Sequence, residues 1–244
     1  MRELPTANCR LSILAACLLA SGAFAQEAPA PTTTPEETAS ATPAAAASAS
    51  PSATATTRNI PLRFVPPPME GTISLGIWDS NDKLVRVLHR EAKIDSFTVE
   101  ENSLSTTWNG KNDAGEDLPA GKYRARGYLV GKMKVEDLGK ADSLPAGLTD
   151  RVSVKLITNP LTSDTRVAME VAIAFDNKSS FLKTTDDLPL ATVNEAPNIA
   201  RVAIQKSGEK AAEVWQDDGS NVEHFRVSNI DKMMAFDCGY FELK

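Results

Sequence analysis

Apolar residues alternate with other residues in several short segments, which is the two-residue period of a half-buried β-strand. The segment TISLGIW places Ile73, Leu75 and Ile77 on one face. A turn-forming run, DSNDK, precedes a return strand, LVRVLHR, and two further strands are expected at STTW and KYRARGYLV. Four strands within about sixty residues, without a helical period, predict a small β-sandwich over residues 59–133.

A second antiparallel β domain is expected at residues 151–244, after a connector at 134–150. Its predicted strands are RVAMEVAIAF, IARVAIQ, AAEVW, VEHFRV and MMAF. The dipeptide Asp218-Gly219 lies between two of them and is typical of a β-hairpin turn. The predicted fold class is therefore all-β, with two antiparallel β domains.

The second region contains an internal similarity between AFDNKSSFLK, residues 174–183, and AFDCGYFELK, residues 235–244. Both segments are predicted to form a strand, an Asp-led turn and a second strand. Repeated hairpins of this kind are typical of propeller blades and β arrays. The region has too few strands for a closed propeller, so the similarity indicates only partial, propeller-like hairpins.

The N-terminus has the pattern of a secretory signal peptide, with basic residues followed by the apolar run LSILAACLLASGAFA. The small residues of AFA place the expected cleavage after Ala25, which makes Gln26 the new N-terminus. LAAC also fits a bacterial lipobox, in which Cys17 is acylated. That alternative leaves an apolar core shorter than the usual seven to fifteen residues, so the cleaved, unanchored form is favoured.

Residues 26–58 contain no aromatic residue and no Leu, Ile or Val. Such a segment buries too little apolar surface to offset its conformational entropy, and we expect a disordered Ala/Pro/Ser/Thr-rich linker. A spacer between the envelope and the folded part is the simpler interpretation. A glycosylated stalk is the alternative.

Charge and cysteine content limit the partners and the covalent cross-links that this chain can have. The formal net charge is −6, and removal of residues 1–25, with two basic and one acidic side chain, changes it to −7. This acidic balance argues against nucleic acid as a partner. Only Cys238 remains after cleavage, so no intramolecular disulfide is expected. No later segment has the length and apolarity of a membrane span.

The stretch TWNGKNDAGEDLPAGKY, residues 107–123, is rich in turn-forming residues between two aromatic positions. It resembles the FlgD-type immunoglobulin-like domain, a family named after the flagellar hook-capping protein. The resemblance covers residues 70–131 and implies a β-sandwich. The matching positions are Trp108, Asn109, Gly110, Asn112, Asp113, Gly115, Leu118, Gly121 and Tyr123.

The loop has a structural and a functional interpretation. Gly110 and Gly115 supply positions of positive φ, and we expect Trp108, Leu118 and Tyr123 to close one end of a small core. The alternative is a calcium site, although the acidic residues lack the regular spacing of an EF-hand loop. The interpretation as a structural turn is favoured over the calcium site. The calcium ligands would be Asn109, Asn112, Asp113, Glu116 and Asp117.

Other candidate sites are weak. His89 and His224, the two histidines, have no second metal-type ligand nearby in sequence, so no zinc site and no other cofactor is expected. Two carboxylate pairs have neighbours typical of turns, so we expect turn residues and not the catalytic acids of a glycosidase. They are Asp186-Asp187 and Asp217-Asp218. No Gly-x-Ser-x-Gly elbow occurs. Cys238 is expected to be a small buried residue.

These observations favour a non-catalytic, exported protein of the bacterial envelope that binds or scaffolds other components. Protein binding through sheet edges, including self-association, is the first hypothesis. Binding of a glycan or cell wall is the second, and it requires exposure of Trp215 or Tyr240. A hydrolase is the least favoured.

Overall fold

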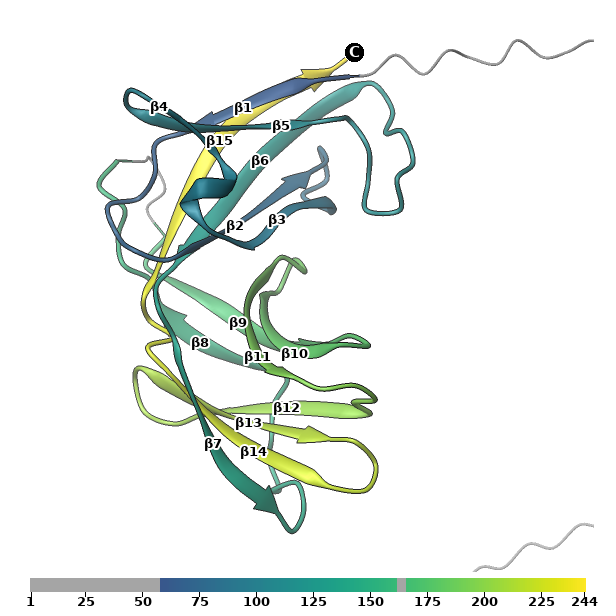
Figure 1. The fold of residues 1–244 in the computed structure, drawn as a ribbon, viewed down its shortest axis with the longest axis vertical. Helices are drawn as coiled ribbons and strands as arrows, with labels where there is room; N and C mark the ends of the chain where they lie inside the picture. Colours follow the sequence, from purple (N-terminus) through teal and green to yellow (C-terminus); the bar gives the residue numbers. More distant parts are fainter. Residues whose placement is uncertain (1–57, 162–165) are drawn as a thin grey trace, which may run out of the picture. The chain divides into compact units, whose positions relative to one another are not determined.

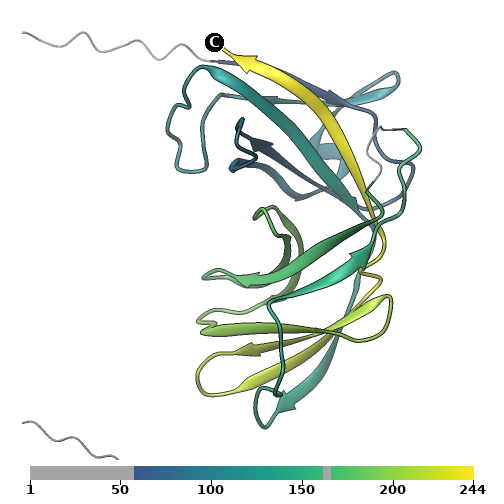
Figure 2. The same ribbon diagram turned by 180° about the vertical axis from the view of Figure 1, so that it is seen from behind.

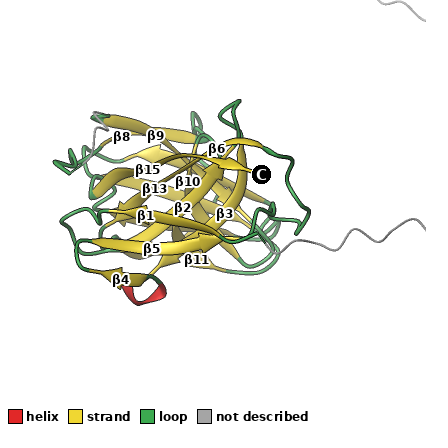
Figure 3. Cartoon of the chain, turned by 90° about the horizontal axis from the view of Figure 1, so that it is seen from above, coloured by secondary structure: helices red, strands yellow, loops and turns green. Residues whose placement is uncertain are grey.

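The computed structural model describes residues 58–161 and 166–244, and within them the fold is all-β, as predicted (Figure 1). The described residues form fifteen strands in four antiparallel sheets and one short 3₁₀ helix, which Figure 3 separates by colour. The predicted signal peptide, its cleavage site at Ala25 and Gln26, Cys17 and the linker up to residue 57 lie outside the described residues.

The first sandwich has a central sheet of strand order β15-β6-β2-β3. Its strands are β2 (Thr72–Trp78), β3 (Leu84–Ala92), β6 (Gly121–Val130) and β15 (Met233–Leu243). A smaller sheet, β1-β5-β4, packs on one face and consists of β1 (Ile60–Phe64), β4 (Thr98–Glu100) and β5 (Ser103–Trp108). The 3₁₀ helix η1 (Ile94–Ser96) leads into β4.

Two more four-stranded sheets form the remaining region. One is a meander of β8 (Arg151–Lys155), β9 (Ala168–Phe175), β10 (Ser179–Thr184) and β11 (Pro189–Glu195). The other has the order β12-β13-β14-β7 and consists of β12 (Arg201–Lys206), β13 (Ala211–Asp217), β14 (Val222–Ser228) and β7 (Lys134–Ala141). The predicted turn at Asp218-Gly219 joins β13 to β14.

The central sheet is buried on both faces, which the alternation in β2 did not indicate. Ile73, Leu75 and Ile77 belong to the core shared with the smaller sheet. On the opposite face Ser74 and Trp78 are also fully buried, and Trp78 packs in the core formed with β8 to β14. The second face is covered by residues far away in sequence.

The predicted domain boundaries are wrong in two places. Residues 134–141 of the expected connector form β7, which pairs with β14. Residues 233–243, assigned by sequence to the second domain, form β15, which pairs with β6 in the first sandwich. Long-range pairing overrides sequence proximity here, and the described residues all belong to one compact unit. Figure 2 shows the long β15 running along β6.

The predicted internal repeat is correct for its first copy only. Residues 174–183 form a hairpin, in which the Asp176 side chain accepts hydrogen bonds from the amides of Lys178 and Ser179. In the second copy the Asp237 side chain accepts one from the amide of Gly239, but the chain continues as a single bulged strand. The same local turn chemistry thus makes a hairpin in one place and a β-bulge in the other.

Candidate functional site

The loop between β5 and β6 is anchored by its two aromatic ends. Trp108 and Tyr123 are buried, and their rings meet edge to face with centroids 5.5 Å apart. The Trp108 indole Nε1 donates to the Lys111 carbonyl at 2.9 Å, and the Tyr123 hydroxyl donates to the Pro119 carbonyl at 2.9 Å. Both rings therefore fix the loop backbone to the core.

The middle of this loop bonds to the edge strand β3. The Asp113 carboxylate accepts a hydrogen bond from the Val87 amide at 3.1 Å, and the Arg86 guanidinium donates to the Asn112 carbonyl at 2.9 Å. Gly115 has φ +81°, which permits the tight return of the chain. The loop thereby satisfies a main-chain donor that an edge strand otherwise leaves free.

The oxygens proposed for a calcium site have partners within the chain. The Asn109 side chain accepts from the Lys111 amide, and the Asp117 carboxylate lies 3.1 Å from the Lys111 ammonium. Asn112 and Glu116 bond to each other through their side chains at 2.7 Å. Within the described residues, no group of three or more His, Cys, Asp or Glu side chains is arranged to hold a metal ion.

The two histidines lie on different strands and contact different residues. His89 Nε2 lies 2.8 Å from the Thr106 hydroxyl, and burial lowers the pKa of its ring. His224 stacks on Trp215, with centroids 4.5 Å apart, and its Nε2 lies 3.1 Å from the Glu213 carboxylate. Because Trp215 is only 4% exposed, its ring is not a platform for a sugar.

The two carboxylate pairs are parts of turns. Asp217 accepts from the Gly219 amide, and Asp218 accepts from the amides of Ser220 and Asn221. Asp186 and Asp187 point to different partners, Arg126 and Lys183.

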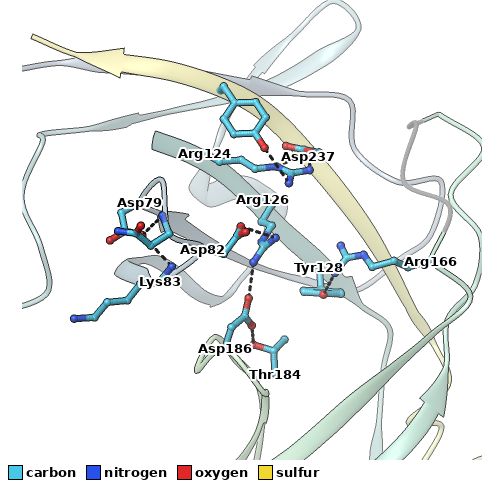
Figure 4. Close-up of polar contacts among 12 residues, drawn as sticks. Asp79, Asp82, Lys83, Arg124, Arg126, Tyr128, Arg166, Thr184, Asp186 and Asp237 are labelled. Carbon is cyan, nitrogen blue, oxygen red and sulfur yellow. Dashed lines mark hydrogen bonds and ion pairs between the residues drawn. The ribbon is translucent and has the colours of Figure 1, made fainter. Parts of the chain in front are cut away.

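A row of polar side chains follows alternate positions of β6 (Figure 4). Of the two arginines in β6, Arg126 is the more buried. Its guanidinium lies 2.7 Å from the Asp186 carboxylate and 3.6 Å from the Asp82 carboxylate. Its guanidinium also lies over the Trp78 ring, 4.4 Å from the centroid. These contacts join the central sheet to the β10–β11 turn, so this part of the row is structural.

Beyond Arg124, this row of β6 side chains borders an exposed residue of the neighbouring strand, Tyr240 of β15. The Tyr240 side chain is 60% exposed, with the Lys122 ammonium 4.4 Å and the Arg124 guanidinium 5.1 Å from its ring centroid. Arg124 also bonds the Asp237 carboxylate. Tyrosine and arginine are the side-chain types enriched at the centre of protein interfaces.

A groove of about 390 Å³ lies beside Tyr240, between β15 and β1. Both strands are edges of their sheets, and no backbone hydrogen bond joins them within the described residues. The groove combines apolar walls with one basic side chain. Its lining residues are Pro61, Leu62, Arg63, Cys238, Tyr240 and Phe241.

The main-chain direction along β15 follows from its hydrogen bonds. The carbonyls of Met233 and Ala235 accept hydrogen bonds from Ile157 and Asn159. The main-chain groups of Met233 and Ala235 therefore point away from β6. Alternate residues of a strand point to the same side, and the bulge after Asp237 shifts this order by one. Tyr240 and Glu242 consequently direct their main-chain groups outward, along the groove.

Sequence reasoning named Tyr240 and Cys238 but missed the basic residues around them. Lys122, Arg124 and Arg126 alternate in the segment GKYRARGYLV. Three basic residues at every second position indicate one basic face of a strand, and this signal was available. The proximity of β1 to β15 was not, because it depends on a pairing between residues far apart in sequence.

Comparisons with known proteins give little. No family model and no curated protein matches the chain. The search of solved structures matches truncated FlgD from Helicobacter pylori, at 13% identity, over 58% of this chain and 83% of that chain, with a TM-score of 0.24. That TM-score carries no weight for fold or function. No helix in residues 58–161 and 166–244 has the length and apolarity needed to cross a membrane.

Proposed function

We propose that this chain is a non-catalytic binding protein of the bacterial envelope that holds an extended, acidic segment of a partner protein along the outer edge of β15. The observation that carries the proposal is the pair of outward-directed main-chain positions, Tyr240 and Glu242, beside an apolar groove. An added strand gains affinity from main-chain hydrogen bonds and specificity from pockets for alternate side chains.

The preference for an acidic segment comes from the charges beside the groove. Arg63 extends from β1 with most of its side chain exposed, and Lys122 lies exposed on β6 next to Tyr240. Two carboxylates lie along this part of β15: Asp237, which pairs with Arg124, and Glu242. Basic side chains on both sides of the edge attract an acidic strand and raise its association rate.

Two other described edges, β7 and β4, are less suited to accept a strand. The outer strand β7 carries Lys134, Glu136, Asp137 and Lys140 and contains a bulge, features that discourage pairing. The outer strand β4 has three residues. On β15, the carbonyls of Met233 and Ala235 already have partners, which limits the available edge to the end near Tyr240.

Export is supported by the sequence pattern of residues 1–25 and by the composition of residues 26–58. Purification of the chain from its bacterial host and measurement of its intact mass test this part. A mature chain beginning at Gln26 is expected. A mass that includes residues 1–25, or an acyl group on Cys17, contradicts cleavage after Ala25.

Site-specific photocrosslinking tests the binding function. A photoreactive phenylalanine analogue replaces Tyr240 in the full-length chain in its host, and Val99 on the edge strand β4 is the control because it is 68% exposed. We expect adducts from position 240 to an acidic, extended segment of one partner, and none from position 99. Adducts to polysaccharide, or equal adducts at both positions, overturn the proposal.

A pair of substitutions at Glu242 separates main-chain from side-chain recognition. Glu242→Pro removes the outward amide, whereas Glu242→Ala keeps it. The adduct at position 240 should disappear with proline and persist with alanine. Equal adducts in both variants exclude strand addition, and circular dichroism of each purified variant establishes that the sheet is intact.

A further inference from the structure

A second cavity, of about 420 Å³, lies in the region formed by β8 to β14. It is framed by the segment after β11 and by the β13–β14 turn. This volume falls within the roughly 300–1,000 Å³ of small-molecule sites. Its lining residues are Ala196, Pro197, Asn198, Gln216, Asp218, Ser220, Asn221 and Glu223.

The floor of the cavity contains a buried amide. Gln216 is 3% exposed, and its Oε1 accepts a hydrogen bond from the buried Ser180 hydroxyl at 2.9 Å. Its Nε2, by contrast, lies 3.5 Å from the Glu223 carboxylate. Amide donors ordinarily approach their acceptors to about 2.9 Å. The Gln216 amide thus retains a donor for a shorter bond.

The Glu223 carboxylate is also weakly engaged. Besides the Gln216 amide at 3.5 Å, its Oε2 has the Asn194 side-chain amide at 3.3 Å. A carboxylate with long bonds to two neutral amides can accept shorter bonds from a ligand. Gln216 and Glu223 together offer a donor and an acceptor side by side.

The turn side of the cavity adds further polar groups. The Asp218 carboxylate accepts the Ser220 and Asn221 amides at 2.7 Å, which lower its pKa and keep it charged. On the opposite side, Asn198 has φ +60°, an uncommon value for a residue other than glycine. These groups surround the floor without any lysine, arginine or aromatic residue in the lining.

We propose that this cavity binds a neutral, hydroxyl-rich molecule of the size of a mono- or disaccharide. The Glu223 carboxylate accepts hydrogen bonds from adjacent hydroxyl groups, and the Gln216 amide donates to a ligand oxygen. An anionic ligand is disfavoured because Asp218 and Glu223 are both acidic and Lys140, the nearby cation, already bonds the Asn221 side chain. This site is separate from the β15 edge and does not depend on the function proposed for it.

Ligand-observed NMR of the mature chain with a panel of neutral mono- and disaccharides tests this proposal. We expect saturation transfer from at least one sugar, with a Kd of about 1 mM or tighter. Glu223→Gln should weaken that binding about tenfold or more, because a charged acceptor is replaced by an amide. Glu209→Gln, at a largely exposed site away from the cavity, is the matched control and should leave the Kd unchanged.

Three outcomes overturn the proposal. They are the absence of binding to every sugar, equal weakening by both substitutions, and saturation by inorganic phosphate or Ca²⁺ instead of a sugar. Asn198→Gly provides a second variant, because glycine accepts the positive φ while removing a side chain from the wall. This variant should bind the same sugar more weakly. If Asn198→Gly and Glu223→Gln each bind that sugar with wild-type affinity, binding in the cavity is contradicted.

Discussion

The Arg126 guanidinium donates a 2.7 Å hydrogen bond to the Asp186 carboxylate, although the two residues lie 60 positions apart. Arg126 belongs to β6 of the central sheet, and Asp186 to the turn between β10 and β11. The same guanidinium covers the Trp78 ring. One side chain thus combines an ion pair and a cation–π contact where two parts of the fold meet.

Arg126→Met should lower the free energy of unfolding by about 2–4 kcal/mol, because it leaves the partly buried Asp186 without its cation. Urea denaturation of the full-length chain measures this loss. Arg151→Met is the control, since both side chains of its pair with Asp150 are more than half exposed and its loss should change stability far less. Similar losses in the two variants would show that Arg126 is not a connecting residue.

Asp113→Ala should lower the free energy of unfolding by about 1 kcal/mol, because the Val87 amide at the edge of β3 loses its acceptor. Hydrogen exchange of the Val87 amide should become faster at the same time. Asp117→Ala removes a comparably exposed carboxylate from the same loop, where it pairs with Lys111. That control should leave Val87 exchange unchanged, and faster exchange in both variants would contradict the anchoring role of Asp113.

Glu213 should stabilise the fold in a pH-dependent manner. Its carboxylate accepts hydrogen bonds from Arg226 at 2.9 Å and Ser207 at 3.0 Å, and Arg226 is the main cause of its lowered pKa. A carboxyl whose pKa is lower in the folded state contributes stability above its ordinary pKa of 4.5, and this is lost as pH falls through the folded value.

Glu213→Gln should therefore lower the free energy of unfolding by about 1 kcal/mol at neutral pH, and the difference from wild type should shrink as pH falls below 4.5. Denaturation at a series of pH values measures it. Glu209→Gln, at a largely exposed pair with Lys155, should change stability by less than about 0.5 kcal/mol at neutral pH. A Glu213→Gln difference that is constant with pH would contradict the lowered pKa.

Cys238 should react slowly with thiol reagents in the folded protein. Burial, with a smaller contribution from Asp237, raises its pKa to about 12, and the thiolate is the reactive form. In a chain that begins at Gln26 this is the single cysteine. Reaction with Ellman's reagent at pH 8 should be slow in buffer and fast in guanidinium, and fast reaction in both would place the thiol in solvent.

The sequence predicts strands better than it predicts their partners. The alternation of Ile73, Leu75 and Ile77 identifies β2, because it reflects the face packed against a neighbouring sheet. Burial of Trp78 on the other face depends on residues of β8 to β14, which no local pattern can indicate. The turn chemistry of Asp237 likewise predicts a reversal, whereas pairing with β6 keeps β15 extended.

The candidate site was predictable only in parts. Tyr240 stands out as an aromatic residue, and the alternating basic residues of β6 indicate a charged face. The groove also requires β1, which enters from the opposite end of the sequence. The polar cavity depends in the same way on Gln216 and Glu223, neither of which is unusual in its local sequence.

The pairing of β15 with β6 has a consequence for biosynthesis. Gly121 pairs with Leu243, so the ribosome completes β2, β3 and β6 long before the strand that covers the β6 edge exists. An uncovered central strand is a template for aggregation, and contacts between distant residues form slowly. The central sheet can therefore be completed only after Met233–Leu243 has been made.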